Sequence, residues 1–247
     1  DTIQKDSIDR ALRNRLWNLL YDFYFSQLED YDYKTPAYIK SIMGGIWTVH
    51  LNQLKDEMPD LHSVYDGYKD YFFSCQWFEV YDFIQYVILT GLKGDYKSRT
   101  EGFVIVLNVQ LKSFLSAYRW INDDFVPITG EAEIQSIDEA LKNTSIYKSV
   151  NTHLETALKL MSDRTAPDYR NSIKESICAV ESMCKIITGK EKATLGEALG
   201  VIEKSGKLHP ALVKSFSNLY GYSSGSSGIR HALGLTEEAD LNQDDAK

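Results

Sequence analysis

The sequence predicts an all-α fold in two parts, a helical first domain with a short β-hairpin and a second domain built as a bundle of helices. Apolar residues such as Leu12 and Leu16 recur at helical spacing along most of the chain. Proline and glycine mark helix starts and ends, as Pro167 and Gly189 do for one long segment. Strand-like patterning is confined to residues 118–128. The 247 residues are enough for one large domain or two ordinary ones.

The first half is mostly helical. We expect helices over residues 8–28, 37–55, 68–91, 98–117 and 131–142. Pro36 fits the first turn of the second of these, and Gly44-Gly45 within it permits a close helix crossing or marks a bend. The segment 68–91 is apolar nearly all round, which is typical of a helix at the centre of a bundle, and Gly91 ends it.

A hairpin and a domain boundary follow. In "AYRWINDDFVPIT", aromatic and β-branched residues flank the polar Asn122-Asp123-Asp124, which predicts a short β-hairpin over residues 118–128. The polar stretch "KNTSIYKS" is the expected boundary between a first domain, residues 1–145, and a second domain, residues 146–247.

The second half carries four helix signals. We expect helices over residues 147–161, 168–188 and 195–204, and a fourth that has Pro210 in its first turn. Thr194 and Glu197 are spaced as a capping box in front of the third. Short connections between these helices predict an antiparallel four-helix bundle.

Charge divides the chain unevenly. The formal net charge is −8, and residues 1–145 carry all of it, with 14 basic against 22 acidic residues. Residues 146–236 hold 12 basic against 8 acidic residues. A general nucleic-acid-binding surface is therefore not expected, although the second domain permits a phosphate-bearing ligand.

Several classes of protein are excluded. The three cysteines form no C-x-x-C pair, so neither a disulfide framework nor a structural zinc site is expected. No apolar run reaches membrane-spanning length and the opening residues are too polar for a secretory signal, so we predict a soluble cytoplasmic protein without membrane contact. The histidines lack metal-ligand spacing, and phosphate-loop and dinucleotide-binding motifs are absent, so no metal and no cofactor is expected.

Candidate chemistry lies at Arg230-His231, which follow the glycine-serine stretch "SSGSSG". Arginine offers a permanently charged fork for a phosphate, and histidine can move a proton near neutral pH. Together they could support metal-free RNA cleavage, with His231 assisting attack of a 2′-hydroxyl and Arg230 stabilising charge. The alternative is structural, an arginine paired with a carboxylate beside a hydrogen-bonded histidine.

A second candidate is a stripe on the helix 168–188. Arg170, Lys174, Ile177 and Glu181 share one face, and Asn171 lies beside them. One interpretation is a solvated face with pairs such as Asn171 to Glu175. The other is that Arg170, Asn171 and Lys174 form the wall of a phosphate pocket opposite Arg230-His231.

The linked runs "LRNRLWNLL", "YRWINDDFVPITGEAEIQSIDEAL", "SDRTAPDYRNSIKESICAVESMCKIITGKEKATLGEALG", "LHPALVKSFSNLYGY" and "GIRHAL" resemble the AbiJ-type N-terminal domain of bacterial abortive-infection proteins. The resemblance covers nearly the whole chain and implies a role in phage defence. The second half is similar to HEPN domains, four-helix bundles that often dimerise and that in many members act as metal-independent ribonucleases.

The HEPN motif is R-[N/D/H]-x-x-x-H on the last helix. Arg230 and His231 match its first two positions, and Leu235 takes the place of the final histidine. Arg170-Asn171 is a second partial match, with Glu175 in the histidine position. The resemblance also implies a final helix beyond the terminal "EEADLNQDDAK". Either the bundle is truncated at this last helix, or residues 229–234 and the tail close it in another way.

These observations lead to one leading hypothesis and two alternatives. The leading hypothesis is a sensor or regulatory module of an anti-phage system, whose degenerate HEPN pocket binds a nucleotide or RNA phosphate and whose partners are a phage or defence-system protein and a second copy of the chain. The first alternative is a metal-independent HEPN endoribonuclease toxin using Arg230 and His231. The second is a non-catalytic protein-protein interaction scaffold.

Overall fold

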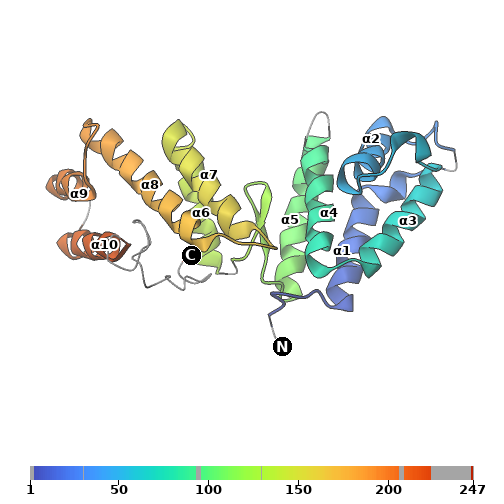
Figure 1. The fold of residues 1–247 in the computed structure, drawn as a ribbon, viewed down its shortest axis with the longest axis horizontal. Helices are drawn as coiled ribbons and strands as arrows, with labels where there is room; N and C mark the ends of the chain where they lie inside the picture. The colour runs from blue at the N-terminus through green and yellow to red at the C-terminus, as the bar shows by residue number, and fades with distance from the viewer. Residues whose placement is uncertain are drawn as a thin grey trace, which may run out of the picture. The chain divides into compact units, whose positions relative to one another are not determined.

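The computed structural model describes residues 3–29, 31–92, 96–128, 130–205, 209–223 and 246. The chain divides into two compact units, residues 1–129 and residues 130–247 (Figure 1). Each unit is described by itself. Both are dominated by helices, and the described strands form one short antiparallel hairpin, so the predicted all-α class is confirmed.

The first unit is built from five α-helices, one π-helical turn and the hairpin. Their bounds are α1 Arg10–Phe23, α2 Ala37–Gly45, the π-helix η2 Ile46–His50, α3 Leu61–Ser74, α4 Trp77–Gly91, α5 Lys97–Ser113, β1 Arg119–Ile121 and β2 Asp124–Val126, with 3₁₀ turns η1 Phe25–Gln27 and η3 Lys55–Glu57. Helices α1, α4 and α5 lie side by side (Figure 1). Their facing side chains form one apolar core rich in aromatic rings. Its largest fully buried members include Tyr24, Tyr68, Tyr81, Phe72, Phe83 and Phe103.

The single helix predicted over residues 68–91 is wrong. The structure has two helices, because α3 ends at Ser74 and α4 begins at Trp77. Gln76 starts the new helix with a capping box, in which the Glu79 carboxylate accepts the Gln76 backbone N–H at 2.7 Å. Both helices are buried on wide faces, so apolar residues are frequent on both sides of the turn, which itself contains the exposed Ser74 and Gln76.

The helix predicted over 37–55 is also shorter than expected. It becomes a π-helix after Gly45, where the Leu51 N–H bonds to the Ile46 carbonyl oxygen at 2.8 Å, and it ends at His50. Asn52 then takes a left-handed conformation, with φ of 51°. The close crossing expected at Gly44-Gly45 is present, because the Tyr86 hydroxyl occupies the space that a side chain at Gly45 would need.

The hairpin prediction is confirmed. Trp120 pairs with Phe125 across the two strands, and the turn residues Asn122 and Asp123 have φ of 46° and 66°. Two consecutive left-handed residues are typical of the type I′ turn, whose twist matches that of paired strands. Asn108 of α5 fixes the hairpin, because its side chain accepts the Trp120 N–H at 2.8 Å and donates to the Trp120 carbonyl oxygen at 3.0 Å.

The second unit consists of consecutive helices. These are α6 Glu131–Thr144, α7 Lys148–Ser162, α8 Tyr169–Thr188, α9 Leu195–Lys204 and α10 Pro210–Ser223. Helix α7 packs along α8, α6 packs on α7, and α9 contacts both α8 and α10 (Figure 1). The helix positions agree with the predicted ones, whereas the compact unit includes α6, which the expected boundary at residue 145 assigns to the first domain. No helix among the described residues is long and apolar enough to cross a bilayer.

Candidate functional site

The predicted catalytic pair, Arg230 and His231, lies outside the described residues, as does the glycine-serine stretch before it. The assignment of these two residues therefore stays a prediction. The other predicted site residues lie on α8 and are described in full.

The start of α8 is closed by its own cap. The Asp168 carboxylate accepts the Asn171 backbone N–H at 3.0 Å and the Asn171 side-chain amide at 2.6 Å. These hydrogen bonds hold the pKa of Asp168 below its ordinary value, so the carboxylate is ionised at neutral pH. Helix N-termini favour anions, and here the protein's own carboxylate already takes that place.

Asn171 is thus a capping partner. The expected side-chain pair between Asn171 and Glu175 is not formed, because each of these residues bonds to another partner. The sequence pattern allows the Asn171 side chain to bond either to Glu175 or to Asp168, and in the structure it bonds to Asp168, the residue that caps the helix.

The remaining residues of the stripe differ in their surroundings. Arg170 is half-buried and Lys174 is exposed one turn later, so both place positive charge near the start of α8. Ile177 is buried in the core of the unit. Glu181 accepts a hydrogen bond from the Tyr220 hydroxyl of α10 at 2.7 Å. The stripe is therefore not one continuous polar wall, and its cationic part is Arg170 and Lys174.

A pair that the sequence analysis did not identify joins α7 to α8. His153 Nδ1 lies 2.7 Å from Glu175 Oε2, and the two side chains are 33% and 27% exposed. A carboxylate bonded to Nδ1 orients the imidazole ring and favours a proton on that nitrogen. The two residues are 22 positions apart on separate helices, so no local spacing could have indicated the contact.

This pair has a bearing on the partial HEPN match. Glu175 occupies the position where the motif has histidine, and His153 supplies an imidazole beside that same position from the neighbouring helix. The arrangement places an imidazole and a carboxylate in contact at a partly exposed site, with the Arg170 charge on the same helix.

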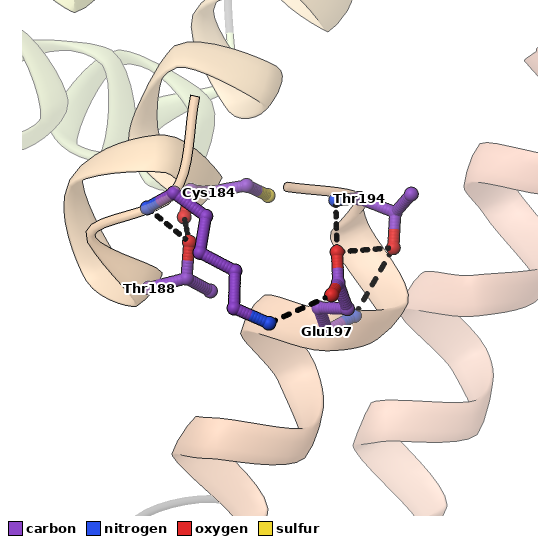
Figure 2. Close-up of polar contacts among 5 residues, drawn as sticks. Cys184, Thr188, Thr194 and Glu197 are labelled. Atoms are coloured by element: carbon purple, nitrogen blue, oxygen red, sulfur yellow. Dashed lines mark hydrogen bonds and ion pairs between the residues drawn. The ribbon is translucent and has the colours of Figure 1, made fainter. Parts of the chain in front are cut away.

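Polar contacts at the far end of α8 are structural. Figure 2 shows the capping box of α9, in which Thr194 Oγ1 accepts the Glu197 N–H at 3.3 Å and the Glu197 carboxylate accepts the Thr194 N–H at 3.0 Å. Lys190 adds an ion pair to Glu197 at 3.1 Å. The capping box predicted from Thr194 and Glu197 is confirmed.

Among the described residues, no three or more His, Cys, Asp or Glu side chains are grouped closely enough to hold a metal ion. No disulfide bond joins Cys75, Cys178 or Cys184. Burial raises the pKa of Cys75 to about 11, which leaves that thiol protonated and a poor nucleophile at neutral pH.

Comparison with known proteins gives one family. The family described as AbiJ N-terminal domain 4 matches residues 1–143, which include the runs "LRNRLWNLL" and "YRWINDDFVPITGEAEIQSIDEAL". No curated protein and no solved structure matches the chain. The matched segment is more than half of the chain and ends close to the expected domain boundary. The chain belongs to the AbiJ N-terminal domain 4 family, whose AbiJ-type domain suggests a setting of abortive infection and phage defence.

Proposed function

We propose that the chain is a sensor or regulatory module of an anti-phage abortive-infection system. In this proposal the second domain is a HEPN-like bundle with a degenerate pocket, which binds a nucleotide or RNA phosphate rather than cleaving RNA efficiently. The family match over residues 1–143 is the observation that carries the defence role.

Phosphate binding is supported by charge and position on α8. Arg170 and Lys174 stand one helical turn apart, and residues 146–236 have a local excess of basic residues. Arg230 would hold the phosphate and His231 would bond to it or relay a proton. Asn171 bonds to Asp168, so we assign it to positioning the start of α8 rather than to direct contact with the ligand.

Degeneracy of the motif argues for binding over cleavage. Leu235 and Glu175 stand where the two partial motifs would have their final histidine. A leucine cannot transfer a proton, and a carboxylate at a phosphate site repels the ligand.

The test measures RNA binding and RNA cleavage on the same samples. Binding of a fluorescein-labelled RNA oligonucleotide and of a labelled adenosine nucleotide is followed by anisotropy in EDTA. We expect Arg170→Ala/Lys174→Ala to weaken binding by roughly tenfold and to lower the salt dependence, because each lost phosphate contact removes released counterions. The charge-matched control is Lys185→Ala/Lys192→Ala, with both lysines exposed near the other end of α8. If both double variants bound RNA equally weakly, the loss would follow from the change in net charge alone, and the proposed pocket would be contradicted.

The endoribonuclease alternative is favoured by one observation, the His153–Glu175 contact beside the partial motif. It is tested by incubating the protein with a mixed RNA pool in EDTA and reading fragments that end in a 2′,3′-cyclic phosphate. Cleavage by the wild type that is lost in Arg230→Ala/His231→Ala would establish the enzyme and overturn binding without cleavage. His153→Gln in the same assay shows whether the pair takes part.

The scaffold alternative predicts neither binding nor cleavage, and tolerance of both double substitutions in a phage-plating assay. Loss of protection in Arg230→Ala/His231→Ala would contradict it.

Homodimerisation is part of our proposal, since HEPN-like sites are commonly shared between two copies. Sedimentation of the wild type tests it, and a monomer at all concentrations would contradict it.

A further inference from the structure

A cavity in the first unit lies between the π-helix η2 and helix α3. Its volume is about 380 Å³ and its walls are mainly apolar. Trp47 comes from η2, Tyr68 and Tyr71 come from α3, and Gln53 comes from the loop that joins these elements. Cavities of this size, lined by aromatic rings with a few polar groups, are typical of ligand sites, and π-helical turns occur frequently at such sites.

Most side-chain donors that line the cavity are already used in hydrogen bonds. Trp47 Nε1 donates to the Leu54 carbonyl oxygen at 2.7 Å, and the Tyr68 hydroxyl donates to the Met43 carbonyl oxygen at 2.6 Å. Gln53 Nε2 donates one of its two hydrogens to the Leu51 carbonyl oxygen at 2.9 Å, and Gln53 Oε1 is an acceptor. A phosphate needs several donors, whereas this lining offers mainly ring faces and oxygen acceptors.

Two of the hydroxyl groups that line the cavity donate hydrogen bonds to carboxylates. The Ser63 hydroxyl donates to Asp60 Oδ2 at 2.6 Å, and the Tyr71 hydroxyl donates to Glu79 Oε1 at 3.4 Å. Hydrogen bonds from Ser63 and His62 keep the pKa of Asp60 below its ordinary value, so its charge persists at neutral pH. A hydroxyl that gives its proton to a carboxylate keeps its oxygen as an acceptor, and such oxygens favour a positively charged donor.

Gly67 lines the cavity at an exposed position. It lies in the middle of α3, where glycine costs roughly 1 kcal/mol relative to alanine, yet nothing lies within 4 Å of the position that its Cβ would take. No neighbour in the described structure requires glycine there, and a larger residue would project into the cavity that Gly67 lines.

We propose that this cavity binds a cationic side chain, arginine in first place, from a basic segment of a partner protein. Aromatic rings attract cations through their faces, and the planar guanidinium stacks on such rings while it donates to several acceptors at once. None of the described lining residues is positively charged, and residues 1–129 hold 13 basic against 18 acidic residues, so the unit that contains the cavity complements a basic partner.

The experiment titrates the full chain into short fluorescein-labelled glycine-serine peptides at physiological salt, read by anisotropy. One peptide carries a single arginine, one carries lysine, and one carries citrulline, which has nearly the shape of arginine without its charge. The blocking variant is Gly67→Leu, which fills the cavity from a position with open space. The matched control is Gly200→Leu in α9, where a Cβ also meets nothing within 4 Å and which does not line the cavity.

We expect the wild type and Gly200→Leu to bind the arginine peptide most tightly, and the citrulline peptide at least about tenfold more weakly. We expect Gly67→Leu to lose this difference while its thermal stability is unchanged or higher. If Gly67→Leu bound the arginine peptide as tightly as the wild type, the peptide would be binding to the acidic surface outside the cavity, and the proposal would be overturned. No binding by the wild type, or displacement of the peptide by adenosine monophosphate at similar concentration, would overturn it as well.

Discussion

The Arg13 guanidinium donates through Nη1 to the Cys75 carbonyl oxygen at 3.0 Å, and the same nitrogen reaches the Phe72 carbonyl oxygen at 2.7 Å. A half-buried side chain of α1 thereby satisfies backbone acceptors at the C-terminus of α3, where the helix leaves its last carbonyls without partners. Arg13 belongs to the run "LRNRLWNLL". Its role in this structure is to hold the turn between α3 and α4 against α1.

Substitution of Arg13 tests that role. We expect Arg13→Met to lower the free energy of unfolding by roughly 1–3 kcal/mol, because it leaves two partly buried carbonyl groups without this donor. Arg13→Lys keeps the charge but has a different reach and geometry, so an intermediate loss is expected. Urea unfolding followed by circular dichroism measures both, and an unchanged midpoint in Arg13→Met would contradict the capping role.

Two adjacent glycines provide a matched pair. Gly44→Ala meets nothing within 4 Å, so we expect a gain of up to about 1 kcal/mol from helix propensity. Gly45→Ala would place its Cβ against the Tyr86 hydroxyl and ring, so we expect a loss of roughly 1–3 kcal/mol from overpacking. Thermal unfolding compares the two, and similar effects would show that α2 and α4 are not in close contact at Gly45. Tyr86→Phe should restore part of the loss in Gly45→Ala, because the hydroxyl is the nearest group.

His50 should make stability depend on pH. Its ring lies among those of Tyr71, Phe83 and Tyr86, and its Nε2 is buried without a hydrogen-bond partner in the described structure. Burial lowers its pKa from the ordinary 6.5, while nearby carboxylates oppose the shift. The unfolded chain therefore binds this proton more readily than the folded chain, and the contribution is lost as pH falls through 6.5 toward the lower folded value.

The measurement is the urea midpoint of wild type and His50→Gln between about pH 8 and pH 5, the range in which histidine titrates. We expect the wild type to lose stability faster than the variant on the acidic side. Carboxylates that titrate in both proteins cancel in the difference. Parallel curves would show that His50 keeps an ordinary pKa and is not buried in the aromatic cluster.

The start of α9 can be weakened locally. We expect Thr194→Ala to cost about 1 kcal/mol through loss of the capping oxygen and Thr194→Ser to cost less, since serine also caps well. Amide hydrogen exchange should show faster opening of the first turn of α9 in the alanine variant, with α7 unchanged. Equal exchange in all three proteins would mean that the bonds around Glu197 do not hold this turn.

Sequence patterns predicted the elements whose signals are local. Gly189 ends α8 with a φ of 67°, Thr194 and Glu197 start α9, and the hairpin follows from strand-forming residues around a turn that accepts left-handed backbone. Each of these features depends on neighbours within a few residues, so the order of amino acids is enough to indicate it.

Hydrophobic periodicity did not predict the helix ends in segments that are buried on wide faces. The break between α3 and α4 lies in a segment rich in apolar residues, and the hydrogen bonds from Arg13, more than fifty residues away, help to fix its position. The π-helical turn at Ile46–His50 likewise has no pattern of its own.

The candidate site residues also fall into two groups, those that local sequence patterns indicate and those that only the packing of helices brings together. Composition and motif predicted Arg170, Asn171 and Lys174 as site residues, and the helix that carries them is observed as α8. Family resemblance indicated phage defence, which the match over residues 1–143 supports. The His153–Glu175 contact and the cavity at Trp47 and Gly67 arise only when helices pack, because their members come from different elements. The sequence by itself determined where the helices of the second unit begin, through caps and spacing that act over short range. Tertiary structure decided which side chains meet, because a contact between helices depends on the packing of the whole unit.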